Sequence, residues 1–206
     1  MATLRLAVLI SAGGTTLQNL IDRKAQGRLN AEIVTVISSR PAVYGLVRAA
    51  QAGLPHEVIA RKGKTREQFG EAMYSRIREV KADLVCLAGF LEFLPIPHDF
   101  THRVINIHPS LIPAFCGKGY YGHHVHEAAL AAGVKVSGCT VHFADNEFDH
   151  GPIILQRTVP VLDEDTAETL GQRVFHAECE AFPEAINLIA EGRLRLEGHQ
   201  VHIQPR

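Results

Sequence analysis

The chain has 206 residues, of which 46% are hydrophobic and 21% charged, and its formal net charge is -1. This length allows one domain with a full core, or one domain and a small appendage, but not two domains of ordinary size. The charge balance leaves no basic surplus for nucleic acid, and no apolar run reaches the roughly 18 residues of a membrane helix. Because a signal peptide is also absent from its start, we expect a cytoplasmic protein without nucleic-acid or membrane partners.

The first half of the chain alternates strand and helix patterns. Strands are predicted from continuous apolar runs and helices from apolar residues at helical spacing. The expected strands cover residues 4–10, 33–37, 58–59, 83–89 and 104–108, and the expected helices contain residues 17–21, 43–52 and 65–80. Such alternation requires right-handed crossovers, so we predict an α/β fold with one open, mostly parallel twisted sheet that carries helices on both faces.

The second half departs from this alternation. Two predicted strands, residues 135–143 and 152–161, are separated only by a loop, so we expect them to pair antiparallel. Helices are expected at residues 122–132 and from residues 163–166 toward Ile189. Residues 194–203 predict a closing hairpin, which completes an antiparallel C-terminal strand region.

Residues 106–113, Asn-Ile-His-Pro-Ser-Leu-Ile-Pro, carry the strongest chemical signal. Side chains two positions apart in a strand share a face, so Asn106 and His108 point the same way while Ile107 enters the core. Pro109 ends the strand. The polar pair is therefore expected at the carboxyl end of a strand, where open α/β sheets bind ligands. The competing interpretation is an ordinary hydrogen-bonded pair at a strand end.

A second polar cluster lies in the loop between the two later strands, where Asp149 precedes His150, Gly151 and Pro152. If this loop folds over the end of the sheet, Asp149 meets His108. An amide, an imidazole and a carboxylate then form a set for proton transfer and oxyanion stabilisation, without a metal or a covalent intermediate.

The loop Gly13-Gly14-Thr15-Thr16 joins the first strand to the first helix. Its backbone N–H groups and the helix dipole can receive an anion. The loop lacks the G-x-G-x-x-G fingerprint and the Walker A lysine, which argues against NAD and against nucleoside triphosphate hydrolysis. A phosphate monoester suits it better, and an ordinary glycine turn with a threonine cap is the alternative.

Neither the cysteines nor the histidines predict a metal site. The four cysteines lie far apart, and Cys116 has no charged neighbour that would lower its pKa, so a nucleophilic role is disfavoured. His123, His124 and His126 form the densest histidine group, but residues one and two apart on a helix do not face each other. We therefore predict no metal and expect His126 and His142 to line the polar site.

These motifs identify a family resemblance. Residues 106–113 and 148–156, the latter Phe-Asp-His-Gly-Pro-Ile-Ile-Leu-Gln, resemble the phosphoribosylglycinamide formyltransferases in order and separation. The resemblance covers nearly the whole chain. It implies formyl transfer from 10-formyltetrahydrofolate, a co-substrate, to the amine of glycinamide ribonucleotide in de novo purine biosynthesis. It also implies small-molecule partners only, and a monomer or homodimer.

The resemblance assigns a role to each group of residues. Asn106, His108 and Asp149 match the catalytic triplet, in which Asp149 orients or ionises His108 and relays the amine proton. The implied contacts to the nucleotide and its phosphate are Gly13, Gly14, Thr15, Thr16 and Glu178. The implied folate contacts are Arg66, Leu91, Glu92, Phe93, Leu94, Asn106, Ala144, Asp145 and Glu147. We treat residues 1–206 as one formyltransferase domain, with a nucleotide- and phosphate-binding half at 1–103 and a catalytic and folate-binding half at 104–206.

Three positions and one loop depart from the family pattern. Glu92 stands where many members carry a basic residue, Thr16 replaces an asparagine, and Phe175 falls where some members have a lysine. The loop at residues 116–121 is longer than in the commonest members. Periodicity alone favours an exposed charged helix face for Glu178, so its assignment to the nucleotide rests on the resemblance.

Two alternative functions stay open. A sugar-nucleotide or other amine formyltransferase would use the same donor with a different acceptor. A catalytically silent module would bind folate or nucleotide without turnover. Methionyl-tRNA formyltransferases and formyltetrahydrofolate hydrolases carry an additional domain after or before the common one, which we do not expect in this chain.

Overall fold

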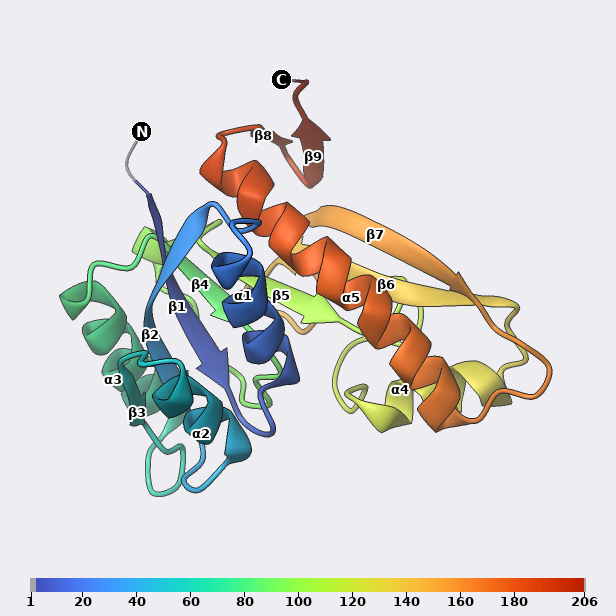
Figure 1. The fold of residues 1–206 in the computed structure, drawn as a ribbon, viewed down its shortest axis with the longest axis horizontal. Helices are drawn as coiled ribbons and strands as arrows, with labels where there is room; N and C mark the ends of the chain where they lie inside the picture. Colours follow the sequence, from blue (N-terminus) through green and yellow to red (C-terminus); the bar gives the residue numbers. More distant parts are fainter. Residues whose placement is uncertain (1–2, 206) are drawn as a thin grey trace. The chain divides into compact units, whose positions relative to one another are not determined.

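The structure is a computed structural model that describes residues 3–205 (Figure 1). Its seven-stranded sheet has the order β3 (His56–Val58), β2 (Ala31–Ser38), β1 (Leu4–Ile10), β4 (Leu84–Leu87), β5 (Val104–His108), β6 (Val136–Phe143) and β7 (Ile153–Pro160). A separate sheet pairs β8 (Leu194–Glu197) with β9 (Gln200–Ile203). The parallel β1–β2, β1–β4 and β2–β3 pairs and the antiparallel β6–β7 pair confirm the predicted α/β class.

The chain divides into two compact units, and the division falls inside β5. The N-terminal unit extends to Ile105 and the C-terminal unit begins at Asn106. Because the polar pair at the end of β5 comes directly after this division, Asn106 and His108 both belong to the C-terminal unit.

The N-terminal unit contains the helices α1 (Thr15–Ala25), α2 (Tyr44–Gln51) and α3 (Arg66–Glu79), and the 3₁₀ helix η1 (His98–Phe100). Helices α1 and α2 lie next to each other (Figure 1). The crossovers from β1 to β2 and from β2 to β3 run in one direction along the sheet, and the crossover from β3 to β4 runs in the other. Right-handed crossovers therefore put α3 on the opposite face from α1 and α2, which gives this unit helices on both faces.

Burial explains the continuous apolar runs from which the strands of the N-terminal unit are predicted. Every residue from Leu6 to Ile10 is fully buried, as expected for a central parallel strand covered on both faces. The edge strand β3 gives a weaker signal, since it covers His56–Val58 rather than the predicted 58–59 and leaves Val58 41% exposed. Thr65 caps α3 through a capping box with Gln68, in agreement with the predicted start of this helix.

The C-terminal unit contains α4 (His123–Ala131) and α5 (Ala167–Ala190). Helix α5 runs along β6 and β7 (Figure 1). Gly138 is required where the two strands approach each other, because a Cβ there would lie 2.0 Å from the carbonyl oxygen of Arg157. The β6–β7 register shifts between Val141 and His142. Such bulges turn side chains locally, and this one lies beside the polar residues described below.

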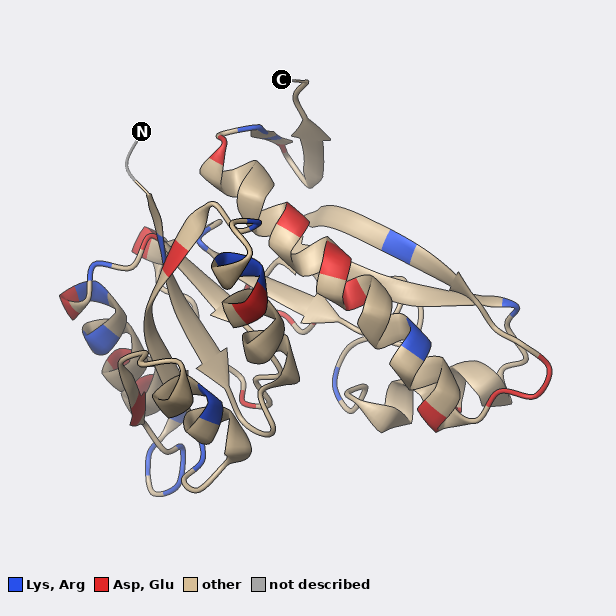
Figure 2. Ribbon diagram, viewed as in Figure 1, with Lys and Arg blue, Asp and Glu red and all other residues tan. Residues whose placement is uncertain are grey.

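Basic and acidic residues are interspersed on both units in the view of Figure 2, in keeping with the net charge of -1. Among residues 3–205, no helix has the length and apolar character needed to cross a bilayer.

Candidate active site

Asn106, His108 and Asp149, here called the triplet, come together in the C-terminal unit. Nδ1 of His108 lies 3.5 Å from Oδ2 of Asp149, and Nδ2 of Asn106 lies 3.4 Å from Oδ1 of the same carboxylate. Ile107 is 8% exposed and packs into the core. The predicted strand alternation and the predicted meeting of Asp149 with His108 are therefore both present in the structure.

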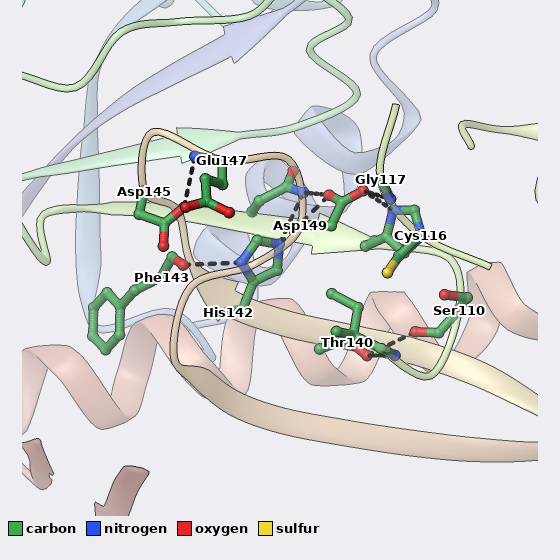
Figure 3. A network of polar contacts seen from close by, with 12 residues as sticks. Ser110, Cys116, Gly117, Thr140, His142, Phe143, Asp145, Glu147 and Asp149 are labelled. Atoms are coloured by element: carbon green, nitrogen blue, oxygen red, sulfur yellow. Dashed lines mark hydrogen bonds and ion pairs between the residues drawn. The ribbon is translucent and has the colours of Figure 1, made fainter. Parts of the chain in front are cut away.

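The carboxylate of Asp149 is fixed by the loop after β5. The backbone N–H of Gly117 donates to Oδ2 over 2.8 Å (Figure 3). Asp149 itself has a φ of 53°, in the left-handed region that aspartate tolerates better than most residues. Its side chain is 11% exposed. A carboxylate with this little exposure and one strong donor retains acceptor capacity for a further proton or donor.

His108 is held at both ring nitrogens. Its Nε2 atom lies 2.9 Å from the carbonyl oxygen of Phe115. Because a carbonyl only accepts, Nε2 carries a hydrogen, and Nδ1 is then the nitrogen that faces Asp149. Nδ1 and the carboxylate face each other across 3.5 Å, a distance at which a proton on Nδ1 would complete an ion pair. The pair is therefore arranged to hold and pass one proton.

His142 fixes the amide of Asn106. Its Nδ1 atom donates to the carbonyl oxygen of Phe143 over 2.9 Å (Figure 3), so the neutral ring accepts at Nε2 from Nδ2 of Asn106, 3.2 Å away. Burial lowers the pKa of His142, with an opposing contribution from the Phe143 carbonyl. The ring is thus held neutral, and both amide hydrogens of Asn106 are engaged, one by His142 and one by Asp149.

Thr140 and Gln156 hold the loop that follows His108, and no residue pattern predicted either role. The buried hydroxyl of Thr140 donates to the carbonyl oxygen of Ser110 over 2.7 Å and accepts from the N–H of Ile112 over 3.1 Å (Figure 3). The amide nitrogen of Gln156 donates to Ile112 and to Thr140, each over 3.0 Å. Thr140 and His142 share a face of β6, so this one strand supports both the amide and the loop.

His126 lies on the inner side of α4 and is 6% exposed. It packs against Gly171 of α5, where a Cβ would approach its Nε2 atom to 3.2 Å. Burial lowers its pKa, and the charges of His123 and His108 act in the same direction. His126 is therefore a buried ring between two helices, in surroundings that favour its neutral form. Its Nδ1 atom is the polar atom left without a hydrogen-bond partner among the described residues.

In the N-terminal unit, residues 13–16, here called the glycine loop, lead into α1. Gly14 is the N-cap residue with a φ of 69° and has no side chain with which to cap the helix. Thr15 begins the helix and Thr16 is 9% exposed. The first-turn N–H groups therefore lack a side-chain cap from Gly14, and the helix dipole adds positive potential. This is the arrangement expected of an anion site.

The glycine loop is braced by α2. A Cβ at Gly14 would lie 2.7 Å from Cα of Gly45, whereas a Cβ at Gly13 would meet nothing within 4 Å. Arg48 donates to the carbonyl oxygen of Gly13 over 2.9 Å and to the side chain of Gln18 over 3.0 Å. The two backbones pack directly on each other at Gly14 and Gly45, which fixes the loop conformation.

Glu178 lies on α5 with a partly exposed side chain, but its carboxyl group is surrounded by protein, and this burial raises its pKa to about 7. The described residues provide it with no hydrogen bond or ion pair. A carboxylate in such a place is costly unless a donor reaches it. The carboxyl group of Glu178 is therefore buried without a partner among the described residues, which periodicity alone did not predict.

The predicted folate residues of the N-terminal unit are residues 91–94, which follow β4, and Arg66, the first residue of α3. The N–H of Leu91 donates to Oγ of Ser11 over 2.9 Å, and the guanidinium of Arg66 lies 5.2 Å from the ring centre of Phe93. Glu92 lies 3.9 Å from Arg40. The last member of the group, Leu94, is buried, with 6% of its surface exposed.

The predicted folate residues of the C-terminal unit lie in the loop between β6 and β7. Asp145 accepts from the N–H of Glu147 over 2.9 Å and from Nδ1 of His150 over 2.8 Å. Glu147 is exposed and Ala144 is partly buried. This loop is therefore shaped by its own carboxylate.

Cys116 does not have the surroundings of a nucleophile. Its pKa is raised, first by burial and then by the nearby charge of Asp149, and an active thiol requires the opposite shift. Cys86 and Cys139 are buried, whereas Cys179 is only partly buried. The chemistry of this site consequently rests on the amide, imidazole and carboxylate groups.

Comparison with known proteins places these features in a family. The family profile described as Formyl transferase matches residues 4–186. Phosphoribosylglycinamide formyltransferase of Haemophilus influenzae is 37% identical over 202 residues, which are 97% of this chain and 93% of that protein. The crystal structure of glycinamide ribonucleotide transformylase 1 from Symbiobacterium toebii superposes with a TM-score of 0.93 at 44% sequence identity. The superposition covers 98% of this chain and 95% of that protein's chain.

Larger proteins also contain a segment similar to this chain. The trifunctional purine biosynthetic protein adenosine-3 of Bos taurus is 47% identical over 195 residues, which are 93% of this chain and 19% of that protein. The chain thus spans about a fifth of the length of these trifunctional relatives, and only that part of them is comparable.

Proposed function

Because the chain belongs to the formyl transferase family, we propose that it transfers a formyl group from 10-formyltetrahydrofolate to the primary amine of glycinamide ribonucleotide. The observation that carries the proposal is the convergence of Asn106, His108 and Asp149 on one another. These three residue types suit proton transfer and oxyanion stabilisation. The family relationship supplies the donor and the acceptor.

The proposed reaction is a direct transfer. The amine nitrogen forms a bond to the formyl carbon, the bond between that carbon and N10 of the folate breaks, and one proton passes from the amine to N10. Asp149 supports the proton transfer, since its carboxylate lies 3.5 Å from His108 and is held by the Gly117 amide over 2.8 Å. The histidine and the carboxylate share the proton that the amine loses.

The negative charge that builds on the formyl oxygen needs hydrogen-bond donors. The N–H at Nε2 of His108 donates to the Phe115 carbonyl oxygen in this structure, and we propose that the formyl oxygen takes the position of that carbonyl. Phe115 has a φ of 50°, which is unfavourable for an aromatic residue. Its release would therefore relieve backbone strain at the moment when the substrate arrives. The long contact from Asn106 to Asp149, at 3.4 Å, is the weaker of the two amide bonds and would free a second donor.

We assign the nucleotide to two separate features. The glycine loop would bind the phosphate through its N–H groups, because Gly14 leaves the start of α1 without a side-chain cap. Glu178 would accept hydrogen bonds from the hydroxyl or amino groups of the ribonucleotide, because its carboxyl group is buried and its pKa is raised to about 7. Ligand donors would favour the ionised form of Glu178 and offset the cost of its burial.

We assign the folate to residues 91–94 in the N-terminal unit, together with Arg66, and to residues 144–147 in the C-terminal unit. Leu94 is buried and Glu92 is close to Arg40, so main-chain groups are the expected contacts for the pterin. Such contacts are compatible with glutamate at position 92, where many family members carry a basic residue.

The direct test is turnover by the purified chain. It is mixed with 10-formyltetrahydrofolate and glycinamide ribonucleotide, and the release of tetrahydrofolate is followed by absorbance. We expect turnover that requires both substrates. The donor alone serves as the control for hydrolysis, and an amino sugar nucleotide replaces the acceptor in a parallel reaction.

Each result has one meaning. Turnover only with the amino sugar nucleotide would replace the proposed acceptor, and folate release without any acceptor would make the chain a hydrolase. Tight folate binding without turnover under any of these conditions would indicate a silent binding module.

A further inference from the structure

A cluster of metal-ligating side chains lies outside the triplet. Among residues 3–205, only Asp145, His150 and His199 offer three ligand atoms within 4.8 Å of one another. Asp145 and His150 belong to the loop between β6 and β7, and His199 belongs to the turn between β8 and β9. All three lie in the C-terminal unit. Two segments that are distant in sequence thus present their side chains to one point.

The carboxylate of this cluster is already oriented. Oδ1 of Asp145 accepts from the N–H of Glu147 over 2.9 Å (Figure 3), which leaves Oδ2 to face Nδ1 of His150 at 2.8 Å. The rings of His150 and His199 meet edge to face, with their centres 4.9 Å apart. Gly198 supplies the left-handed residue of the turn, with a φ of 59°, so that the next residue, His199, lies against the loop.

We propose that Asp145, His150 and His199 bind a divalent first-row transition ion such as Zn²⁺. Two imidazoles and one carboxylate form a ligand set that zinc uses in sites with an open position for water. Mg²⁺ and Ca²⁺ prefer oxygen ligands and are not expected here. Both histidines are exposed, so the open position has access to solvent.

The spacing of the ligand atoms is compatible with this ion. Zinc bonds of about 2.0–2.1 Å put the ligand atoms of a tetrahedral site about 3.4 Å apart. The ligand atoms span at most 4.8 Å, so the widest separation must close by about 1.4 Å. Oδ2 of Asp145 and Nδ1 of His150, 2.8 Å apart, must move apart by about 0.6 Å as the ion displaces the proton between them. Side-chain rotation of the exposed histidines allows both movements. The bound ion would join the β8–β9 turn to the β6–β7 loop, which also contains Asp149. Any effect of the bound ion on folate binding or on the triplet rests on the proposed function. Binding of the ion itself is independent of that function.

The test uses the full chain without a histidine tag and without folate or nucleotide. Zn²⁺ binding is measured by titration calorimetry, and Co²⁺ serves as a spectroscopic probe because its visible absorption reports a low-coordinate site with nitrogen ligands. We expect one ion per chain. The variant His199→Gln removes one ligand and should weaken Zn²⁺ binding by at least about tenfold.

The matched control is His202→Gln, which changes an exposed histidine on the same hairpin that pairs with Glu197 and lies outside the cluster. Its Zn²⁺ affinity should stay within about twofold of the parent value. The rival site is on α4, where His123 and His124 both approach Glu127. Unchanged affinity in His199→Gln, or loss of binding in Glu127→Gln, would overturn the proposal. Failure of the formyl-transfer assay would not affect it, since no substrate is present.

Discussion

Nδ1 of His108 lies 3.5 Å from Oδ2 of Asp149, while Nε2 of the same ring donates to the carbonyl oxygen of Phe115. This relationship fixes which nitrogen exchanges the proton and which one can face a substrate oxygen. A histidine with its nitrogens in the opposite arrangement would turn its donor away from the developing charge. The orientation of one ring therefore determines both halves of the proposed chemistry.

Asp149→Asn tests the proton-transfer half. Asparagine tolerates the left-handed conformation at this position, where φ is 53°, and its side-chain oxygen can still accept from Gly117. The charge, the proton acceptor and the weak acceptor for the Asn106 amide at Oδ1 are lost. We expect kcat to fall about a hundredfold or more, with a melting temperature close to that of the parent. Steady-state kinetics and thermal unfolding measure the two quantities, and near-normal turnover in a folded variant would remove Asp149 from the mechanism.

His142→Phe tests whether the neutral ring positions Asn106. Phenylalanine has a similar shape but neither donates to the Phe143 carbonyl nor accepts from the Asn106 amide. Two buried polar groups lose a partner, at a cost of about 1–3 kcal/mol each. We expect kcat to fall more than about tenfold, with KM for both substrates changed much less. An equal rise of KM without loss of kcat would instead indicate a substrate-binding role.

The sequence predicted the parts of this site that depend on periodicity, and it did not predict the parts that depend on loop geometry. Strand alternation placed Asn106 and His108 on one face, and the loop before Gly151 supplied Asp149. The Phe115 contact depends on a left-handed aromatic residue, with φ of 50°, and no residue pattern predicts this conformation.

Glu178 shows a related limit. From its spacing, a glutamate on the polar face of an amphipathic helix is predicted to be exposed. Spacing along one helix does not show which other segments pack against that face. The sequence also did not predict the role of Thr140, because threonine is a common residue in buried strands. Its hydroxyl becomes important only because the loop after His108 brings Ser110 and Ile112 to it.

Thr140→Val tests the support of that loop. Valine matches threonine in shape but leaves the Ser110 carbonyl without its donor and the Ile112 N–H without its acceptor. We expect a loss of about 2–4 kcal/mol in the free energy of unfolding and a lower kcat, because the loop carries Phe115 and Gly117 to the triplet. Denaturant unfolding and kinetics are the measurements. Thr158→Val, on the exposed face of β7, is the control for the loss of a strand hydroxyl and should change little.

Gly14 and Gly13 form a matched pair for testing the glycine loop. Alanine at position 14 would need a left-handed φ of 69° and would lie 2.7 Å from Cα of Gly45. We expect Gly14→Ala to destabilise the protein by more than about 2 kcal/mol. Gly13→Ala meets no atom within 4 Å, so it should fold normally. If the loop binds phosphate, Gly13→Ala should mainly raise KM for the nucleotide, and an unchanged KM would contradict that assignment.

Glu178→Gln should separate stability from function through pH. Burial raises the folded-state pKa of Glu178 from 4.5 to about 7, so its favourable contribution is present below the unfolded value and is lost as pH rises through about 7. Ionisation then costs the folded parent about 2 kcal/mol after allowance for partial exposure. Relative to the parent, the glutamine variant should therefore be more stable at about pH 8 than at about pH 4, while its KM for the ribonucleotide rises. Thermal unfolding at both pH values and steady-state kinetics are the measurements, with Glu180→Gln on the exposed face of the same helix as the control. A stability difference that does not vary with pH would show that the carboxyl group ionises without cost.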